Sequence, residues 1–100
     1  MTKLKIILRE QAMNDLEEIW LYTYEAWSLE QADRYHKLIF NEIEFLSTRP
    51  EHGKNQNHFR KGYRSSQVKA HLIFYRCSDS EIEIVRILHE NMDIPNRLHE

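Results

Sequence analysis

Residues 71–93, HLIFYRCSDSEIEIVRILHENMD, decide the fold of this chain. They contain two apolar runs of strand length, 71–77 and 81–88, which are separated by the polar turn SDS. Runs rich in Ile, Val, Phe and Tyr on either side of a short polar turn are typical of a β-hairpin. Each run also carries an arginine, Arg76 or Arg86, so the sequence predicts paired strands with cations among their apolar side chains.

Two amphipathic helices are predicted between residues 10 and 48, because apolar residues recur there every three or four positions. The apolar stripe of the first helix consists of Ala12, Leu16, Ile19, Trp20, Thr23 and Trp27. The stripe of the second helix consists of Ala32, Tyr35, Ile39, Glu42 or Ile43, and Leu46. We therefore expect both tryptophans to lie in the core and Asp15 to point away from it.

Short sequence motifs mark the link between these two helices and the end of the second helix. The stretch SLEQ, residues 28–31, matches a capping box, in which the serine side chain accepts a hydrogen bond from the glutamine amide. Pro50 excludes the helical conformation for the residue before it, so the second helix should stop near Thr48. Neither apolar stripe is satisfied by the partner helix alone, and the pair therefore needs a sheet to lie on.

The predicted fold class is α+β, in one domain that spans residues 1–100. Four strands are expected, at residues 4–8, 63–68, 71–77 and 81–88. The last three form an antiparallel meander, and the first joins the same sheet to gain neighbours. The order β-α-α-β-β-β places a helical hairpin on one face of a four-stranded, mainly antiparallel sheet, with a loop at 50–62 and a short C-terminal tail from Met92. We expect the other sheet face to stay uncovered, so that its apolar side chains form an interaction surface.

Composition indicates one globular domain. The chain has 100 residues, 41% of them apolar, which is too many for a disordered segment. No run approaches the roughly 18 apolar residues of a membrane span, and the start MTKLKIILREQ lacks the features of a signal peptide. The single cysteine, Cys77, cannot form an internal disulfide and fits a reducing compartment. We therefore expect a cytoplasmic protein without a membrane segment.

The net charge of −2 conceals a basic block. Residues 52–78 contain six bases and no acids, whereas residues 10–51 contain ten acids and three bases. This basic block is either a solvated face or a landing surface for an acidic partner or a phosphate backbone. No metal or cofactor is predicted, because the six histidines form no helical i, i+4 pair and the lone cysteine has no CxxC partner.

Six stretches carry a family resemblance when they are taken together and in order. They are DLEEIWLYTYEAW (15–27), QADRY (31–35), RPEHGK (49–54), GYRSSQV (62–68), HLIFYR (71–76) and EIVRILHENMD (83–93). The combination covers nearly the whole chain and resembles the ParE toxins, within the RelE/ParE superfamily of bacterial toxin–antitoxin modules. The closing pattern RILH..MD is its most ParE-like element.

This resemblance implies the toxin component of a type II toxin–antitoxin module, of the kind involved in plasmid stabilisation. ParE-type members are associated with inhibition of DNA gyrase, which blocks replication. Their partner is a ParD-like antitoxin, whose N-terminal part binds DNA and whose C-terminal segment folds along the toxin. The resemblance therefore implies a cytoplasmic, protein-binding toxin in a hetero-oligomer, which needs no cofactor and meets DNA only through the antitoxin.

Eight residues are expected to contact the antitoxin or the target: Arg64, Arg76, Arg86, His89, Met92, Trp20, Leu21 and Tyr24. The arginines lie on three successive strands, so antiparallel pairing is expected to gather them on the uncovered face, where the tail also leaves the last strand. They either present forked donors to an acidic partner or pair with nearby carboxylates, Asp79, Glu81 or Glu83. The seam beside the first helix either takes apolar anchors of the antitoxin or holds ordinary core and rim residues.

The RelE branch of the superfamily supplies an alternative of a different class, ribosome-dependent mRNA cleavage. Such cleavage needs a base for the 2′-hydroxyl, a cation for the phosphorane charge and an acid for the leaving oxygen. Candidates for these roles are Arg64, Arg76, Arg86, His71, His89 and Tyr75. Many RelE-type ribonucleases carry a His or Tyr near the C-terminus. Here the tail lacks Tyr and its His99 has no evident partner, so gyrase inhibition is preferred and no catalytic residue is assigned.

Overall fold

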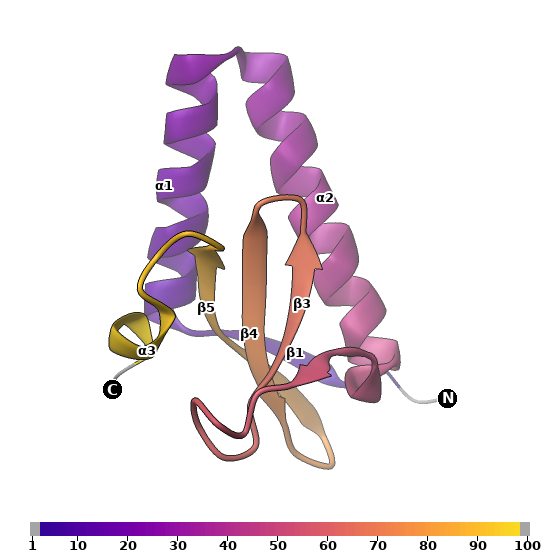
Figure 1. Cartoon of the computed structure of the whole chain (residues 1–100). Helices are drawn as coiled ribbons and strands as arrows, with labels where there is room; N and C mark the ends of the chain where they lie inside the picture. Colours follow the sequence, from indigo (N-terminus) through magenta and orange to yellow (C-terminus); the bar gives the residue numbers. More distant parts are fainter. Residues whose placement is uncertain (1–2, 99–100) are drawn as a thin grey trace.

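The computed structural model describes residues 3–98, so His99 lies outside the described residues. A helical hairpin stands over one face of a sheet and extends beyond it at one end (Figure 1). The helices are α1 (Glu10–Ala26), α2 (Leu29–Thr48), a short 3-10 turn (Pro50–His52) and α3 (Ile94–Arg97). The strands are β1 (Lys5–Leu8), β2 (Lys54–Asn55), β3 (Arg64–Val68), β4 (His71–Cys77) and β5 (Glu81–His89). The α+β class and the predicted order of the main elements are confirmed.

The described strands form one sheet of order β1-β5-β4-β3-β2. Strand β1 runs parallel to β5, and the other neighbours are antiparallel, which confirms the predicted meander of β3, β4 and β5. The sheet has five strands and not the expected four, because β2 lies within the predicted loop 50–62. Its two residues pair with Arg64 and Ser65. A strand this short shows no alternation in the sequence, which is why only the structure reveals it.

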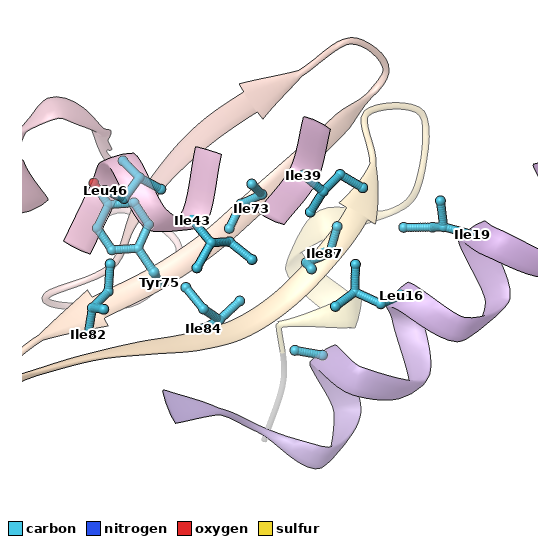
Figure 2. Close-up of a cluster of buried hydrophobic side chains, with 11 residues drawn as sticks. Leu16, Ile19, Ile39, Ile43, Leu46, Ile73, Tyr75, Ile82, Ile84 and Ile87 are labelled. Atoms are coloured by element: carbon cyan, nitrogen blue, oxygen red, sulfur yellow. The ribbon is translucent and has the colours of Figure 1, made fainter. Parts of the chain in front are cut away.

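The two helices cover the sheet with the predicted apolar stripes. At the start of α2, Ser28 Oγ accepts a hydrogen bond from Gln31 N–H at 3.1 Å, which confirms the serine part of the cap. The cluster that we call the first core consists of Ala12, Leu16, Ile19, Ile39, Ile43, Leu46, Ile73, Tyr75, Ile82, Ile84 and Ile87 (Figure 2). Each Leu or Ile buried in this way contributes about 2 kcal/mol, so the first core is what holds the hairpin on the sheet.

Two expectations about α1 are wrong. Trp27 is 75% exposed, because the hairpin outruns the sheet and its outer end meets no strand (Figure 1). The sheet is displaced along the hairpin and is not shorter than it, since the 9 residues of β5 span about 30 Å, as do the 20 residues of α2. Asp15 is buried on the apolar stripe, between Ala12 and Leu16, instead of pointing away. Trp20 is only partly buried.

A β-bulge in β5 breaks the strict alternation of its side chains. The register between β4 and β5 shifts at Phe74 and Tyr75, which leaves Val85 as an extra residue in β5. Strict alternation predicts Val85 and Ile87 on the same face. The bulge separates them, because Ile87 belongs to the first core whereas Val85 lies in a cluster on the opposite face.

The chain itself covers the sheet face that lies away from the hairpin, so the expectation of an uncovered face is wrong. The cluster on this face, the second core, consists of Tyr63, Phe74, Val85, Leu88, Ile94 and Leu98, with Phe59 and Leu72 packed against it. The segment 59–63 covers one part of it with aromatic rings, and α3 covers another. Burial of these isolated apolar side chains stabilises both segments against the sheet, although neither shows an apolar period in the sequence.

Candidate functional site

The three predicted arginines have partners within the chain and do not form one cluster. Arg64 Nη1 donates to Gly53 O at 2.8 Å. Arg76 Nε donates to one oxygen of Glu83 at 2.6 Å, and Arg9 Nε donates to the other at 2.5 Å. The hydrogen bond from Arg9, and then that from Arg76, lower the pKa of the Glu83 carboxyl. Alternation along the ladder places Arg64 on the hairpin side of the sheet and Arg76 on the other side.

Arg86, the third arginine, joins α1, β5 and α3. Its Nε and Nη2 donate to the two oxygens of Asp15 at 2.8 and 2.9 Å, and its Nη1 donates to Arg97 O at 2.8 Å. Asp15 also accepts from Ile87 N–H at 2.9 Å, beyond the end of β1. The hydrogen bond to Asp15 raises the pKa of the Arg86 guanidinium. The cation in this apolar strand therefore has a structural partner, and contact with another protein stays a prediction.

A groove of about 990 Å³ lies beneath the overhanging part of the hairpin. Its walls come from α1 and α2, and carry Tyr22, Trp27, Arg34 and Leu38. Its floor comes from the β3–β4 turn and the facing ends of β4 and β5, and carries Lys69, His71, Ile87, His89 and Met92. We call it the hairpin groove. Of the eight predicted contact residues it brings together His89 and Met92. Its exposed aromatic walls, Tyr22 and Trp27, are not among the eight.

The predicted seam lies on a different side of α1. Trp20 stacks on Tyr24 with ring centroids 5.3 Å apart, and its Nε1 donates to Asp33 of α2 at 3.0 Å. Leu21 and Tyr24 are about half exposed. A smaller outer groove, of about 440 Å³, is lined by Leu8, Met13, Leu16, Glu17, Trp20, His36 and Phe40. The eight predicted residues are thus divided among separate surfaces.

Two histidine rings meet on the floor of the hairpin groove. The rings of His71 and His89 have centroids 5.3 Å apart and planes at 84°. His71 Nδ1 lies 2.6 Å from Tyr35 Oη, whose hydroxyl donates to Val68 O at 3.1 Å. Burial, and then the neighbouring His89, lower the pKa of His71. His89 Nδ1 accepts from Asn91 N–H at 3.1 Å, so the Nδ1 atoms of both rings are held by the protein.

The geometry does not gather the candidates for mRNA cleavage into one site. Tyr75 is buried in the first core, where its Oη donates to Pro50 O at 2.7 Å and accepts from Gly53 N–H at 2.9 Å. Burial raises the pKa of Tyr75 to about 12. The side chains of Arg64, Arg76 and Arg86 donate hydrogen bonds to Gly53 O, Glu83 and Asp15, respectively. Of the six candidates, His71 and His89 are the two whose rings contact each other.

Between residues 3 and 98, no three His, Cys, Asp or Glu side chains are grouped so that they could hold a metal ion. No helix in that range combines the length and the apolar character that a membrane span requires.

The fold and the groove define the class: a small α+β protein in which a helical hairpin covers, and overhangs, a mainly antiparallel sheet. Residues 6–94 match the family model described as the ParE toxin of the type II toxin–antitoxin system, parDE. The chain belongs to this family of ParE toxins.

Similar proteins extend over nearly the full length. The protein named Toxin ParE1 of Mycobacterium tuberculosis (strain CDC 1551 / Oshkosh) is 34% identical over 95 residues, which are 94% of this chain and 97% of that relative. Toxin ParE1 of Caulobacter vibrioides is 35% identical over 86 residues, 86% of this chain and 88% of that relative. A solved structure titled "Chromosomal ParDE TA system from P. aeruginosa" has a TM-score of 0.76 and 19% identity, and the match covers 87% of this chain and 96% of that one. This structural likeness confirms the fold.

Proposed function

We propose that this ParE-family toxin inhibits DNA gyrase in the cytoplasm and is neutralised by a ParD-like antitoxin that places a segment in the hairpin groove. Membership of the ParE family supports gyrase as the target, because ParE-type toxins are associated with that enzyme. The observation that carries the antitoxin part is the hairpin groove itself. The similarity to a structure titled as a ParDE system gives it further support.

The walls of the hairpin groove suit an amphipathic segment of another protein. Trp27 is 75% exposed and Tyr22 is 70% exposed, and Leu38 adds a third apolar side chain from α2. Exposed apolar side chains gathered in this way usually mark an interaction site. A helix with anchors every three or four residues can bury them along one face. The groove is lined by Arg34 and Lys69 and by two acids, Glu18 and Asp15, of which Asp15 is paired with Arg86. Acidic residues on the segment complement the charges of Arg34 and Lys69.

Occupation of the groove also explains how neutralisation would work. The overhang is the end of the hairpin that extends beyond the sheet (Figure 1). It carries the exposed rings of Tyr22 and Trp27, so it can contact another protein. An antitoxin segment in the groove covers those rings. Toxin that carries the antitoxin therefore cannot present the overhang to gyrase, and inhibition requires release of the antitoxin.

The test of this proposal is DNA supercoiling by purified gyrase, with and without the protein, beside a cleavage assay on ribosome-bound mRNA. We expect supercoiling to stop and to recover when the antitoxin from the neighbouring reading frame is added. Trp27→Ala should raise the concentration needed for inhibition by about tenfold, since a buried aromatic anchor is worth at least ~1.4 kcal/mol.

The matched control for Trp27→Ala is Phe45→Ala, which removes an exposed aromatic side chain of α2 that does not line the hairpin groove. It should leave both inhibition and antitoxin rescue unchanged. Cleavage of mRNA with untouched gyrase would contradict the proposal and favour the RelE-type alternative.

A further inference from the structure

The histidine pair on the floor of the hairpin groove is arranged as a pair of donors. In the arrangement in which the Tyr35 hydroxyl donates its single proton to Val68 O, His71 Nδ1 donates to Tyr35 Oη. Neutral His71 then has its lone pair on Nε2. His89 Nδ1 accepts from Asn91 N–H, so neutral His89 carries its proton on Nε2. One added proton on His71 Nε2 would give the pair two N–H donors.

Charges face this pair from every neighbouring element. Helix α1 contributes Asp15 and Glu18, and α2 contributes Arg34 and the hydroxyl of Tyr35. The β3–β4 turn contributes Lys69, and the end of β5 is followed by Glu90.

Two of these three acids, Asp15 and Glu90, accept hydrogen bonds within the fold, whereas Glu18 is exposed on the wall of the groove. Both oxygens of Asp15 accept hydrogen bonds from Arg86, and Glu90 Oε1 accepts one from Gln67 Nε2 at 3.1 Å. Arg34 and Lys69 line the groove, and Lys69 belongs to the block 52–78 that holds six bases and no acids. The groove floor therefore complements an anion, and a carboxylate on an otherwise apolar segment fits both its charge and its walls.

We propose that His71 and His89 form a carboxylate subsite of the hairpin groove, which holds an Asp or Glu side chain of the bound antitoxin segment and takes up one proton on binding. The carboxylate accepts hydrogen bonds from Nε2 of both rings, and solvent supplies the added proton to His71. This subsite rests on the proposed function, because the antitoxin is the occupant. It assigns the histidines to specificity and to the pH dependence of binding.

The direction of the pH dependence follows from the environment of the pair. Burial, and then His89, keep the pKa of His71 below its ordinary value in the free protein, which favours the neutral form of that ring. A bound carboxylate raises that pKa. The extra affinity is then fully present below the pKa of the free protein and is lost as the pH rises through the pKa of the complex. Between these limits the dissociation constant changes by up to about tenfold per pH unit, the limit for one linked proton.

Isothermal titration calorimetry with the purified antitoxin from the neighbouring reading frame tests this subsite. Titrations at pH 7 in two buffers of different ionisation enthalpy should show uptake of about one proton per complex. Wild type should bind more tightly at pH 6 than at pH 8. The double variant His71→Gln with His89→Gln should lose that difference, apart from any pH dependence due to the antitoxin itself.

Two further variants serve as controls. One tests whether the effect arises from unfolding, and the other tests whether replacement of a histidine outside the hairpin groove has the same effect. His89→Gln alone removes a ring whose Nδ1 bonds only one backbone amide, and it should reduce the pH dependence in a protein of unchanged melting temperature. His36→Gln, in the outer groove, should behave as wild type. Tight binding with the same pH dependence in wild type and double variant would overturn the subsite alone. No binding at any pH would overturn the proposed function and the subsite together.

Discussion

At residue scale, the guanidinium of Arg86 is matched by a carboxylate that the sequence places on the apolar side of a helix. Asp15 lies three residues after Ala12 and four before Ile19, so its position on the buried stripe could be read from the spacing. Its charge argues for the solvent side instead. Periodicity predicts where a side chain points, but the partner that makes its burial tolerable lies 71 residues away, in β5.

Asp15→Ala is expected to lower the free energy of unfolding by about 3 kcal/mol, because loss of one partner leaves the other charge uncompensated in a largely buried pair. It also removes the acceptor of Ile87 N–H. Urea unfolding followed by circular dichroism measures the loss. Glu18→Ala, an exposed acid on the same helix, is the control and should change stability by less than about 0.5 kcal/mol. Equal stability of the two variants would show that Asp15 has no structural role.

Gly53 permits a close approach that no other residue allows. A Cβ atom at this position would lie 2.1 Å from Tyr75 Oη, so Gly53→Ala must push the buried ring aside. We expect a loss of about 2 kcal/mol, typical of overpacking. Gly62→Ala is the comparison, since a Cβ atom at Gly62 would have no neighbouring atom within 4 Å. Only the φ of +85° at Gly62 is unfavourable for alanine, and it should lower the stability by about 1 kcal/mol. Thermal unfolding should rank Gly53→Ala as the less stable variant, and the reverse order would be evidence against this contact.

At the scale of elements, length decides what a sequence can predict. The helices α1 and α2 have 17 and 20 residues, so their apolar period is repeated several times and both are predicted correctly. Strand β2 has 2 residues and α3 has 4, too few for any period. The walls of the hairpin groove lie where the hairpin extends beyond the sheet (Figure 1). Tyr22 lies three residues after Ile19 and Trp27 four after Thr23, and they stay exposed because the sheet ends before the hairpin does.

Leu98 tests the placement of α3 on the sheet, because it is 3% exposed within the second core. Leu98→Ala should cost about 2 kcal/mol, the lower end for a buried leucine. It should also increase binding of a hydrophobic dye, because Leu88 and Val85 become accessible. Met92→Ala, 40% exposed before α3, should change stability by less than about 0.5 kcal/mol. A Leu98→Ala variant as stable as wild type would mean that the tail does not cover the sheet.

At the scale of the whole molecule, the chain fills both faces of its sheet, and this moves the site of partner binding. The sequence correctly predicts the α+β class, the element order and the family. It fails on the second face, because Phe59, Tyr63, Ile94 and Leu98 are isolated apolar residues whose burial depends on long-range packing. With that face closed, the exposed apolar surface of the hairpin overhang becomes the best candidate for a partner.

Hydroxyl-radical footprinting of the protein, alone and with its antitoxin, tests most directly whether the partner occupies the hairpin groove. Tyr22 and Trp27 are 70% and 75% exposed there, and Met13 of α1 and Phe45 of α2 are 54% and 42% exposed outside the groove, so all four side chains should react in the free protein. We predict that the antitoxin protects Tyr22 and Trp27 and leaves Met13 and Phe45 reactive. Protection of Met13 and Phe45 with Tyr22 and Trp27 still reactive would contradict the account.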